Sequence, residues 1–170
     1  CGTSVKAYGH AMRLDPQWAE KAARVSAMAR DISEFMTEIG LMPPARPTGQ
    51  RIVYHSACSM QHGQRIINQP KDLLRSAGFM VLDVPEGYLC CGSAGTYNLL
   101  QPEIAQQLKE RKVRNIRSVN AQVAASGNIG CMTQLAGDVG IPFVHTVELL
   151  DWATGGPEPA ALAKAQIAAG

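Results

Sequence analysis

Apolar side chains recur every three or four residues in the first forty positions of the chain, a spacing typical of amphipathic helices. A short stretch of this kind covers residues 5–14, and a longer one begins after Asp15-Pro16, where proline suits a first helical turn. The apolar positions of the longer stretch are Trp18, Ala22, Val25, Met28, Ala29, Ile32, Phe35, Met36 and Ile39. They predict one apolar stripe along a helix that ends at Gly40, before a Pro-rich linker.

The hydrophobic period changes after this linker. Four short apolar runs, at residues 51–55, 78–84, 121–126 and 141–147, predict buried strands. Helical patterns separate them at residues 70–77, 102–119 and 132–139. Strands that alternate with helices are typical of a parallel sheet with right-handed crossovers. We therefore predict an α/β fold, a small parallel sheet of about four strands flanked by helices, with an N-terminal helical segment.

This pattern divides the chain into three parts. Residues 1–49 form a helical segment and linker, residues 50–153 form the α/β domain, and residues 154–170 form an Ala-rich tail, expected to be a frayed helix or disordered. In the predicted helix 102–119, Ile104, Leu108, Ile116 and Val119 are expected to face inward. The outer face would then carry Lys109, Arg111, Lys112, Arg114 and Arg117. Such a basic face is either a solvated surface or a docking face for a partner.

Composition narrows the class of protein. Hydrophobic residues make up 46% of the chain and aromatic residues only 5%, so the core must be largely aliphatic. A net charge of +2 argues against a dedicated nucleic-acid binder. No apolar run reaches the roughly 18 residues of a membrane span, and no signal-peptide pattern opens the chain. We expect a cytoplasmic protein and, since the sequence begins at Cys1 without an initiating Met, a piece of a longer chain.

The five cysteines carry the strongest chemical signal. Their odd number and wide spacing argue against a disulfide framework. Cys58, Cys90, Cys91 and Cys131 each follow the carboxyl end of a predicted strand, and in an open α/β sheet those ends share the edge where ligands bind. Gly92 and Gly130 lie beside these thiols, where glycine lets backbone amides approach a cofactor closely.

Several kinds of chemistry suit such a cluster. The thiols could be buried and unreactive, bind zinc, hold an iron–sulfur cluster, or belong to a thiol–disulfide enzyme. Adjacent Cys90 and Cys91 fit a multi-iron cluster better than one small ion, and no C-x-x-C pair supports thiol exchange. His55 and His145 are candidate ligands or hydrogen-bond donors to a cluster, and His62 is a candidate for a supporting contact.

The segments Tyr54-His55-x-Ala57-Cys58, Cys90-Cys91-Gly92 and Gly130-Cys131 resemble the cysteine-rich CCG domain of heterodisulfide reductase B subunits and of lactate- and glycolate-oxidising complexes. The flanking sequences, HSACSMQHGQ and LCCGSAGTYNLLQPEIA among them, are most similar to iron–sulfur subunits of glycolate oxidase. The resemblance implies a [4Fe–4S] cluster on Cys58, Cys90, Cys91 and Cys131, with zinc as the alternative. Gln134 stands where the family often has a fifth thiol, and Ala57 replaces a common proline.

The resemblance also implies a function. A flavin-containing partner subunit would oxidise glycolate to glyoxylate, and this chain would pass the electrons toward a membrane acceptor such as quinone, at the inner membrane surface. Cys1-Gly2-Thr3 resembles the end of a preceding CCG region. The chain itself has no G-x-G-x-x-G fingerprint and no acid–base constellation. The alternatives are a zinc-bearing structural or docking module and a heterodisulfide reductase-like thiol redox domain.

Overall fold

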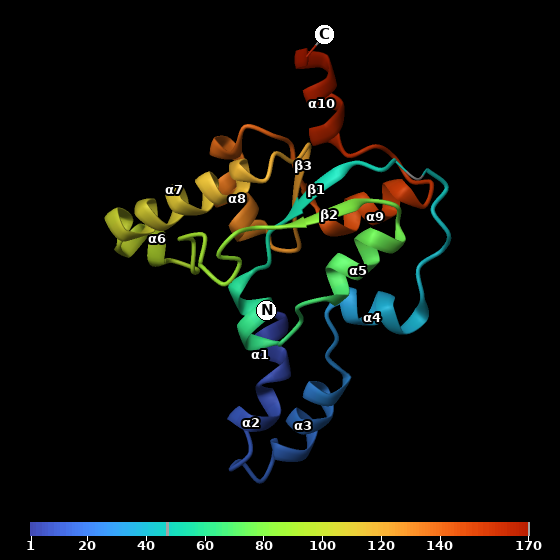
Figure 1. Cartoon of the computed structure of the whole chain (residues 1–170). Coiled ribbons are helices and arrows are strands. Elements are labelled where there is room, and N and C mark those ends of the chain that lie inside the picture. Colours follow the sequence, from blue (N-terminus) through green and yellow to red (C-terminus); the bar gives the residue numbers. More distant parts are fainter. Residues whose placement is uncertain (47, 170) are drawn as a thin grey trace.

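A four-stranded parallel sheet forms the centre of the protein. The computed structural model describes residues 1–46 and 48–169. The strands are β1 (Arg51–Tyr54), β2 (Met80–Asp83), β3 (Val123–Ser126) and β4 (Phe143–His145), arranged in the order β2-β1-β3-β4 (Figure 1). All three pairings are parallel, with Ile52 beside both Val81 and Val123. The predicted α/β class and strand number are confirmed.

Helices cover both faces of this sheet. The crossover helices are α5 (Gln69–Ser76), α7 (Pro102–Ser118) and α8 (Ile129–Val139), and α9 (Thr146–Ala153) follows β4. Successive side chains of a strand point to opposite faces, so each face has its own core. Ile52 packs with residues of α5 and α9, whereas Val53 packs with residues of α7 and α8. The sheet is therefore the middle layer of three, as Figure 1 shows.

The N-terminal segment differs from the predicted pair of helices. It contains four helices: α1 (Gly2–Lys6), α2 (Tyr8–Ala11), α3 (Ala19–Met28) and α4 (Ile32–Ile39). The continuous helix expected to Gly40 is wrong, because the chain is extended at Ala29 and Asp31. The side chain of Asp31 accepts a hydrogen bond from the backbone N–H of Ser33, and the side chain of Glu34 accepts one from the backbone N–H of Asp31. This capping box starts a new helix, which apolar spacing alone does not reveal.

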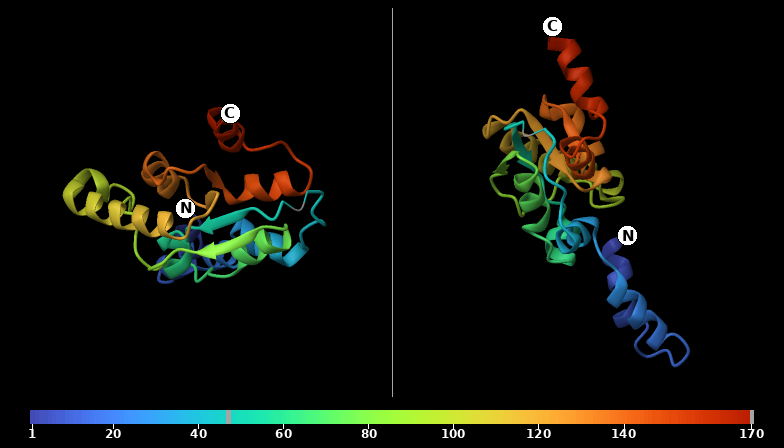
Figure 2. Two further views of the ribbon diagram at one scale, coloured as in Figure 1. Left: turned by 45° about the horizontal axis from the view of Figure 1, so that its top comes forward. Right: turned by 90° about the vertical axis from the view of Figure 1, so that its right-hand side faces the viewer.

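The predicted apolar stripe is also largely solvent-exposed. Trp18 is 53% exposed and Met28 70% exposed. Helices α2 and α3 pack against each other, and Figure 2 shows them extending away from the sheet, while α4 packs on α5. Most of the stripe therefore does not face the core of residues 51–153, although Met36 packs against it on the α5 and α9 side.

Helix α7 buries only part of the predicted face: Ile116 is buried and Val119 packs against the core, as expected. Ile104 is 49% exposed, while Ala105, Val113 and Ile116 are buried against the sheet. Lys112, expected on the basic outer face, is completely buried. Ala105 packs tightly on the loop that follows β2. Lys109, Arg111, Arg114 and Arg117 remain at least partly exposed.

The tail contains a further helix, α10 (Ala160–Ala169), and its Leu162 packs into the core on the α9 side. The linker and tail predictions also include residues 47 and 170, which lie outside the described residues. Two short elements complete the chain: a π-helical turn, η1 (Ser59–Gly63), and α6 (Tyr97–Leu100). Within the part of the chain described, no helix has both the length and the apolar character to span a membrane.

Candidate metal centre

The four strand-end cysteines meet at one edge of the sheet. Neighbouring strands β1 and β3 connect in opposite directions, because β1 leads to β2 on one side and β3 leads to β4 on the other. This is the switch point at which open α/β sheets form a ligand crevice. Cys58 follows β1, Cys131 follows β3, and the Cys90-Cys91 pair follows the edge strand β2. The expected convergence therefore has a topological cause.

A single cavity of about 440 Å³ contains these cysteines in its lining. Its walls are Ala57, Cys58, Ser59, Cys90, Cys91, Ser93, Ala94, Gly95, Asn128, Gly130 and Cys131. All five cysteines of the chain are free thiols, and Cys91 and Cys131 are buried. Gly130 lines the cavity beside its thiol, as the sequence suggested, whereas Gly92 lies buried just behind it.

Two of the thiols are positioned by the first residues of helices. Cys131 lies in the first turn of α8, and its backbone N–H donates to the side chain of Asn128, the N-cap residue, at 3.1 Å. Cys58 directly precedes η1. The helix dipole at this start favours negative charge, so it would stabilise the Cys131 sulfur as a thiolate once a metal is bound.

The Cys90-Cys91 loop is fixed by glycine and by α7. The backbone N–H of Gly92 donates to the sulfur of Cys90 at 3.3 Å, the kind of amide contact that stabilises a thiolate. Gly92 has φ +90°, and a Cβ built there would collide with the backbone carbonyl of Ala105, lying 3.1 Å from its carbon atom. Only glycine allows the loop to approach α7 so closely.

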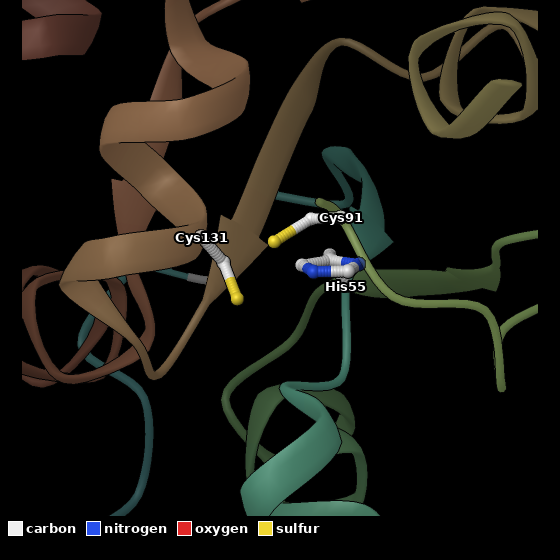
Figure 3. A group of neighbouring side chains, drawn as sticks. All are labelled: His55, Cys91 and Cys131. Atoms are coloured by element: carbon white, nitrogen blue, oxygen red, sulfur yellow. The ribbon is translucent and has the colours of Figure 1, made fainter. Parts of the chain in front are cut away.

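His55, Cys91 and Cys131 form the tightest group of donor atoms (Figure 3). One ligand atom of each lies within 4.8 Å of the others, and all three residues are buried. Neither ring nitrogen of His55 has a hydrogen-bond partner among the described residues, although the side chain is only 1% exposed. A buried imidazole without partners is costly, and a metal held beside Cys91 and Cys131 would supply one. His55 itself lies outside the wall of the 440 Å³ cavity.

Burial and the neighbouring sulfurs shift the pKa values of the thiols in different directions. A hydrogen bond from Cys131 lowers the pKa of Cys91. Burial acts against this shift, and the neighbouring His55 adds to it. The same hydrogen bond, with burial, raises the pKa of Cys131. Burial, followed by the charges of Cys90 and Cys91, raises the pKa of Cys58 to about 11. Thiols that crowd each other in this way are stabilised as thiolates when a cation joins them.

The other candidates lie outside the cavity lining. His62 is exposed on η1, and its Nε2 lies 3.3 Å from the carbonyl oxygen of Tyr88, so it links the Cys58 and Cys90 segments. His145 caps α9, with its Nδ1 accepting a hydrogen bond from Val147. Cys1 is exposed and lines a separate cavity. Sequence reasoning missed Lys112, because a lysine in a helix rich in charged residues gives no signal of burial.

The donor set fits a metal centre. Thiolates and imidazole suit zinc and iron–sulfur clusters. The trio of donors is compact enough for one ion, since thiolate–zinc bonds of about 2.3 Å place tetrahedral ligands roughly 3.8 Å apart. The cavity, at about 440 Å³, greatly exceeds the roughly 30 Å³ that one water molecule occupies in the liquid. The size and the adjacent Cys90-Cys91 pair favour a multinuclear cluster.

Fold and site together define an α/β protein that gathers thiol ligands at the switch point of a parallel sheet. Residues 52–136, 85 of the 170 residues, match the cysteine-rich domain CCG, and the chain belongs to this family. It is 36% identical over 153 residues to the glycolate oxidase iron–sulfur subunit of Escherichia coli, an alignment that covers 90% of this chain and 38% of that protein.

Two further relatives are also similar to most of this chain. Lactate utilization protein A of Geobacillus thermodenitrificans is 27% identical over 166 residues, covering 89% of this chain and 66% of its own length. A probable glycolate oxidase iron–sulfur subunit of Bacillus subtilis is 28% identical over 138 residues, covering 79% and 31%. The chain thus spans between 31% and 66% of the length of these three curated relatives.

Proposed function

We propose that this chain holds a [4Fe–4S] cluster on Cys58, Cys90, Cys91 and Cys131 and serves as an electron-transfer part of a glycolate-oxidising complex. The observation that carries the proposal is the single cavity whose wall includes all four thiols. The two relatives named as glycolate oxidase iron–sulfur subunits support the choice of cofactor and complex. One thiolate for each iron is the usual ligation of such a cluster.

The residues of the chain would position and tune the cofactor. A bound cluster would accept and release single electrons. The N–H of Gly92 and the α8 start at Cys131 place positive dipoles beside the ligating sulfurs, which favours the more negative, reduced state. Buried Cys91 and Cys131 exclude water on one side of the site, whereas Cys58 and Cys90 are only partly buried. The half-open wall gives a partner access within electron-transfer range.

The electrons would come from a flavin-containing partner subunit that oxidises glycolate to glyoxylate, and would pass toward a membrane quinone. The absence of a dinucleotide fingerprint and of an acid–base site in this chain supports placing the bond chemistry in a partner. In this assignment the chain works on the cytoplasmic side, attached to the inner membrane through the complex.

Residues 1–49 would be the end of a preceding CCG region, separate from the domain at residues 50–153 and the tail at residues 154–170. Cys1 supports this division. It lines a cavity of about 170 Å³ whose wall shares Ala57, Ser59 and Asn128 with the cysteine cavity. A thiol that ends one such region would then stand next to the centre of the following one.

Anaerobic reconstitution with iron and sulfide tests the proposal. The protein should become brown and show the electron paramagnetic resonance of a reduced [4Fe–4S] cluster. Cys91→Ala should lower the iron content and stop electron flow to quinone in the complex, while flavin reduction by glycolate continues. Cys1→Ala is the matched control and should retain the cluster of this domain. Full quinone reduction by Cys91→Ala would refute the assignment.

Zinc binding is the second candidate, favoured by the compact His55, Cys91 and Cys131 group. A colourless protein with one zinc per chain and no iron uptake would support a structural or docking module. The two candidates differ in their dependence on Cys90: the cluster needs its thiol, whereas a site built on the trio does not. Metal content of Cys90→Ala therefore separates them.

A further inference from the structure

Lys112 is a buried charged residue that is not among the proposed ligands of the cysteine site. It lies on α7, has no exposed surface, and is the only Lys, Arg, Asp or Glu that is buried among residues 1–46 and 48–169. Its neighbour Val113 packs in the same core cluster as Cys91 and Cys131. Burying an ammonium group is expensive unless negative charge and hydrogen bonds compensate for it.

The ammonium group of Lys112 donates a hydrogen bond to a backbone carbonyl. Lys112 Nζ donates to the carbonyl oxygen of Glu86 at 2.9 Å, and the same oxygen accepts the backbone N–H of Leu89. Glu86 stands at φ +53° in the turn that leads directly to Cys90 and Cys91. Lys112 therefore holds the start of the thiol loop from behind the cavity wall.

No carboxylate of the described chain forms an ion pair with Lys112. The carboxylate of Glu86 is bound instead by Arg111 and by Asn115 Nδ2, the latter at 2.9 Å. Burial lowers the pKa of Lys112, and the negative charges of Cys58 and Cys91, then of Glu86 and Cys90, act in the opposite direction. Three of these four groups are thiols of the candidate site, and they become thiolates when they bind a metal.

We propose that Lys112 is a positioning residue whose fixed positive charge is the counter-charge of the thiolate site, stabilising metal-bound thiolates and the reduced state of a bound cluster. Three observations support this proposal. Lys112 is completely buried, it has no carboxylate partner among the described residues, and it donates a hydrogen bond to the turn before Cys90. The part that concerns the cluster rests on the proposed function, whereas the part that concerns thiolates does not.

Charge balance gives the direction of the effect. When all four thiols bind one divalent ion, they release four protons and the site changes from neutral to a charge of −2. An ion held only by His55, Cys91 and Cys131 would leave the site neutral, and its affinity would not depend on Lys112. One-electron reduction of a cluster by a chemical reductant adds one further negative charge, with no bond formed or broken. Both steps make the site more negative, so a buried cation favours both. Its removal should weaken metal binding and lower the reduction potential.

The experiment compares four variants of the full chain. Lys112→Met removes the charge and the hydrogen bond, Lys112→Gln removes the charge but keeps a donor, and Lys112→Arg keeps the charge. Asn115→Ala is the matched control, since it loosens the same turn, losing the bonds to Glu86 and Pro85, without touching the buried charge. Circular dichroism establishes that each variant is folded before any comparison.

The first readout is the affinity of the metal-free protein for Co²⁺, followed by thiolate-to-cobalt absorption. Lys112→Met and Lys112→Gln should bind about tenfold more weakly than the wild type, and Lys112→Arg and Asn115→Ala should bind within about threefold of it. This readout requires no iron. If the wild-type protein takes up no cluster, the proposed function fails and the cobalt series still decides the role of Lys112.

The second readout is the midpoint potential of the reconstituted cluster. A tenfold loss in the reduction equilibrium corresponds to a shift of about −59 mV for a one-electron couple, and we expect at least this in the Met and Gln variants. An unchanged potential and cobalt affinity in Lys112→Met would overturn the proposal. So would an equal shift in Asn115→Ala, or a loss of metal binding in Lys112→Arg, because turn geometry and not charge would then be responsible.

Discussion

Among substitutions that add one methyl group to the loop after Cys91, we expect Gly92→Ala to disrupt the cysteine site most. Gly92 has φ +90°, which costs a side-chain-bearing residue about 1–2 kcal/mol. The added Cβ would also lie 3.1 Å from the carbonyl carbon of Ala105 and closer still to its oxygen. That carbonyl belongs to the backbone of α7, so it cannot rotate away, and the loop must move off the helix.

The two effects together should cost about 3 kcal/mol, which for a chain of this size lowers the melting temperature by roughly 6–12 °C. Because Cys91 precedes Gly92, the displaced loop should also reduce iron or cobalt uptake. Thermal unfolding followed by circular dichroism and the metal content after reconstitution measure the two effects separately.

Gly95→Ala is the matched control. Gly95 lies in the same loop at φ +69°, but a Cβ there would meet nothing within 4 Å. Gly95→Ala should therefore cost only the strain of its backbone conformation, about 1 kcal/mol. Although Gly95 lines the cavity, the variant should reduce metal uptake less than Gly92→Ala does. Equal stability and equal metal uptake in the two variants would refute the reasoning that the contact with Ala105 places Cys91.

Three further predictions concern other parts of the site and its support. Asn128→Ala removes the N-cap of α8 and should cost about 1 kcal/mol in chemical denaturation, with slower cluster assembly through Cys131; unchanged stability would show that the cap is not needed. Burial by itself raises the pKa of Glu34, but hydrogen bonds from Lys6 and the Asp31 backbone outweigh it and lower the value. The stabilising effect of Glu34 should thus be complete above its ordinary pKa and disappear as the pH falls below about 4.5, which hydrogen exchange of α4 can measure against a pH-insensitive Glu34→Gln variant. In the metal-free protein, alkylation of Cys58 should rise about tenfold per pH unit up to its pKa of about 11, and a plateau near pH 8 would contradict its burial.

Much of the architecture could be predicted from hydrophobic period alone. The four strands lie within the predicted runs, and α5, α7 and α8 each begin and end within three residues of their predicted bounds. Local spacing determines these elements, because burial of one helix stripe or one strand face requires it. The convergence of Cys58, Cys90, Cys91 and Cys131 was predicted for the same reason, since parallel strands bring their carboxyl ends to one edge.

The N-terminal helices show where this reasoning fails. A stripe over residues 18–39 predicts one buried helix face, but the capping box at Asp31 and Glu34 interrupts it, and Trp18 and Met28 remain exposed. Apolar spacing indicates that a helix face can be buried, but it does not identify the surface that covers this face. Whether another surface covers that stripe depends on contacts distant in sequence.

The sequence by itself determined the class of fold, the order of its elements and the edge at which its thiols gather. Tertiary structure decided which side chains surround them. Lys112 was assigned to a solvated face and is buried, and His55 was one of several candidate histidines and is the one that faces Cys91 and Cys131. Ala105 of α7 packs against Gly92, a contact between segments that are distant in sequence. Such contacts fix the environment of a charge, and no local pattern encodes them.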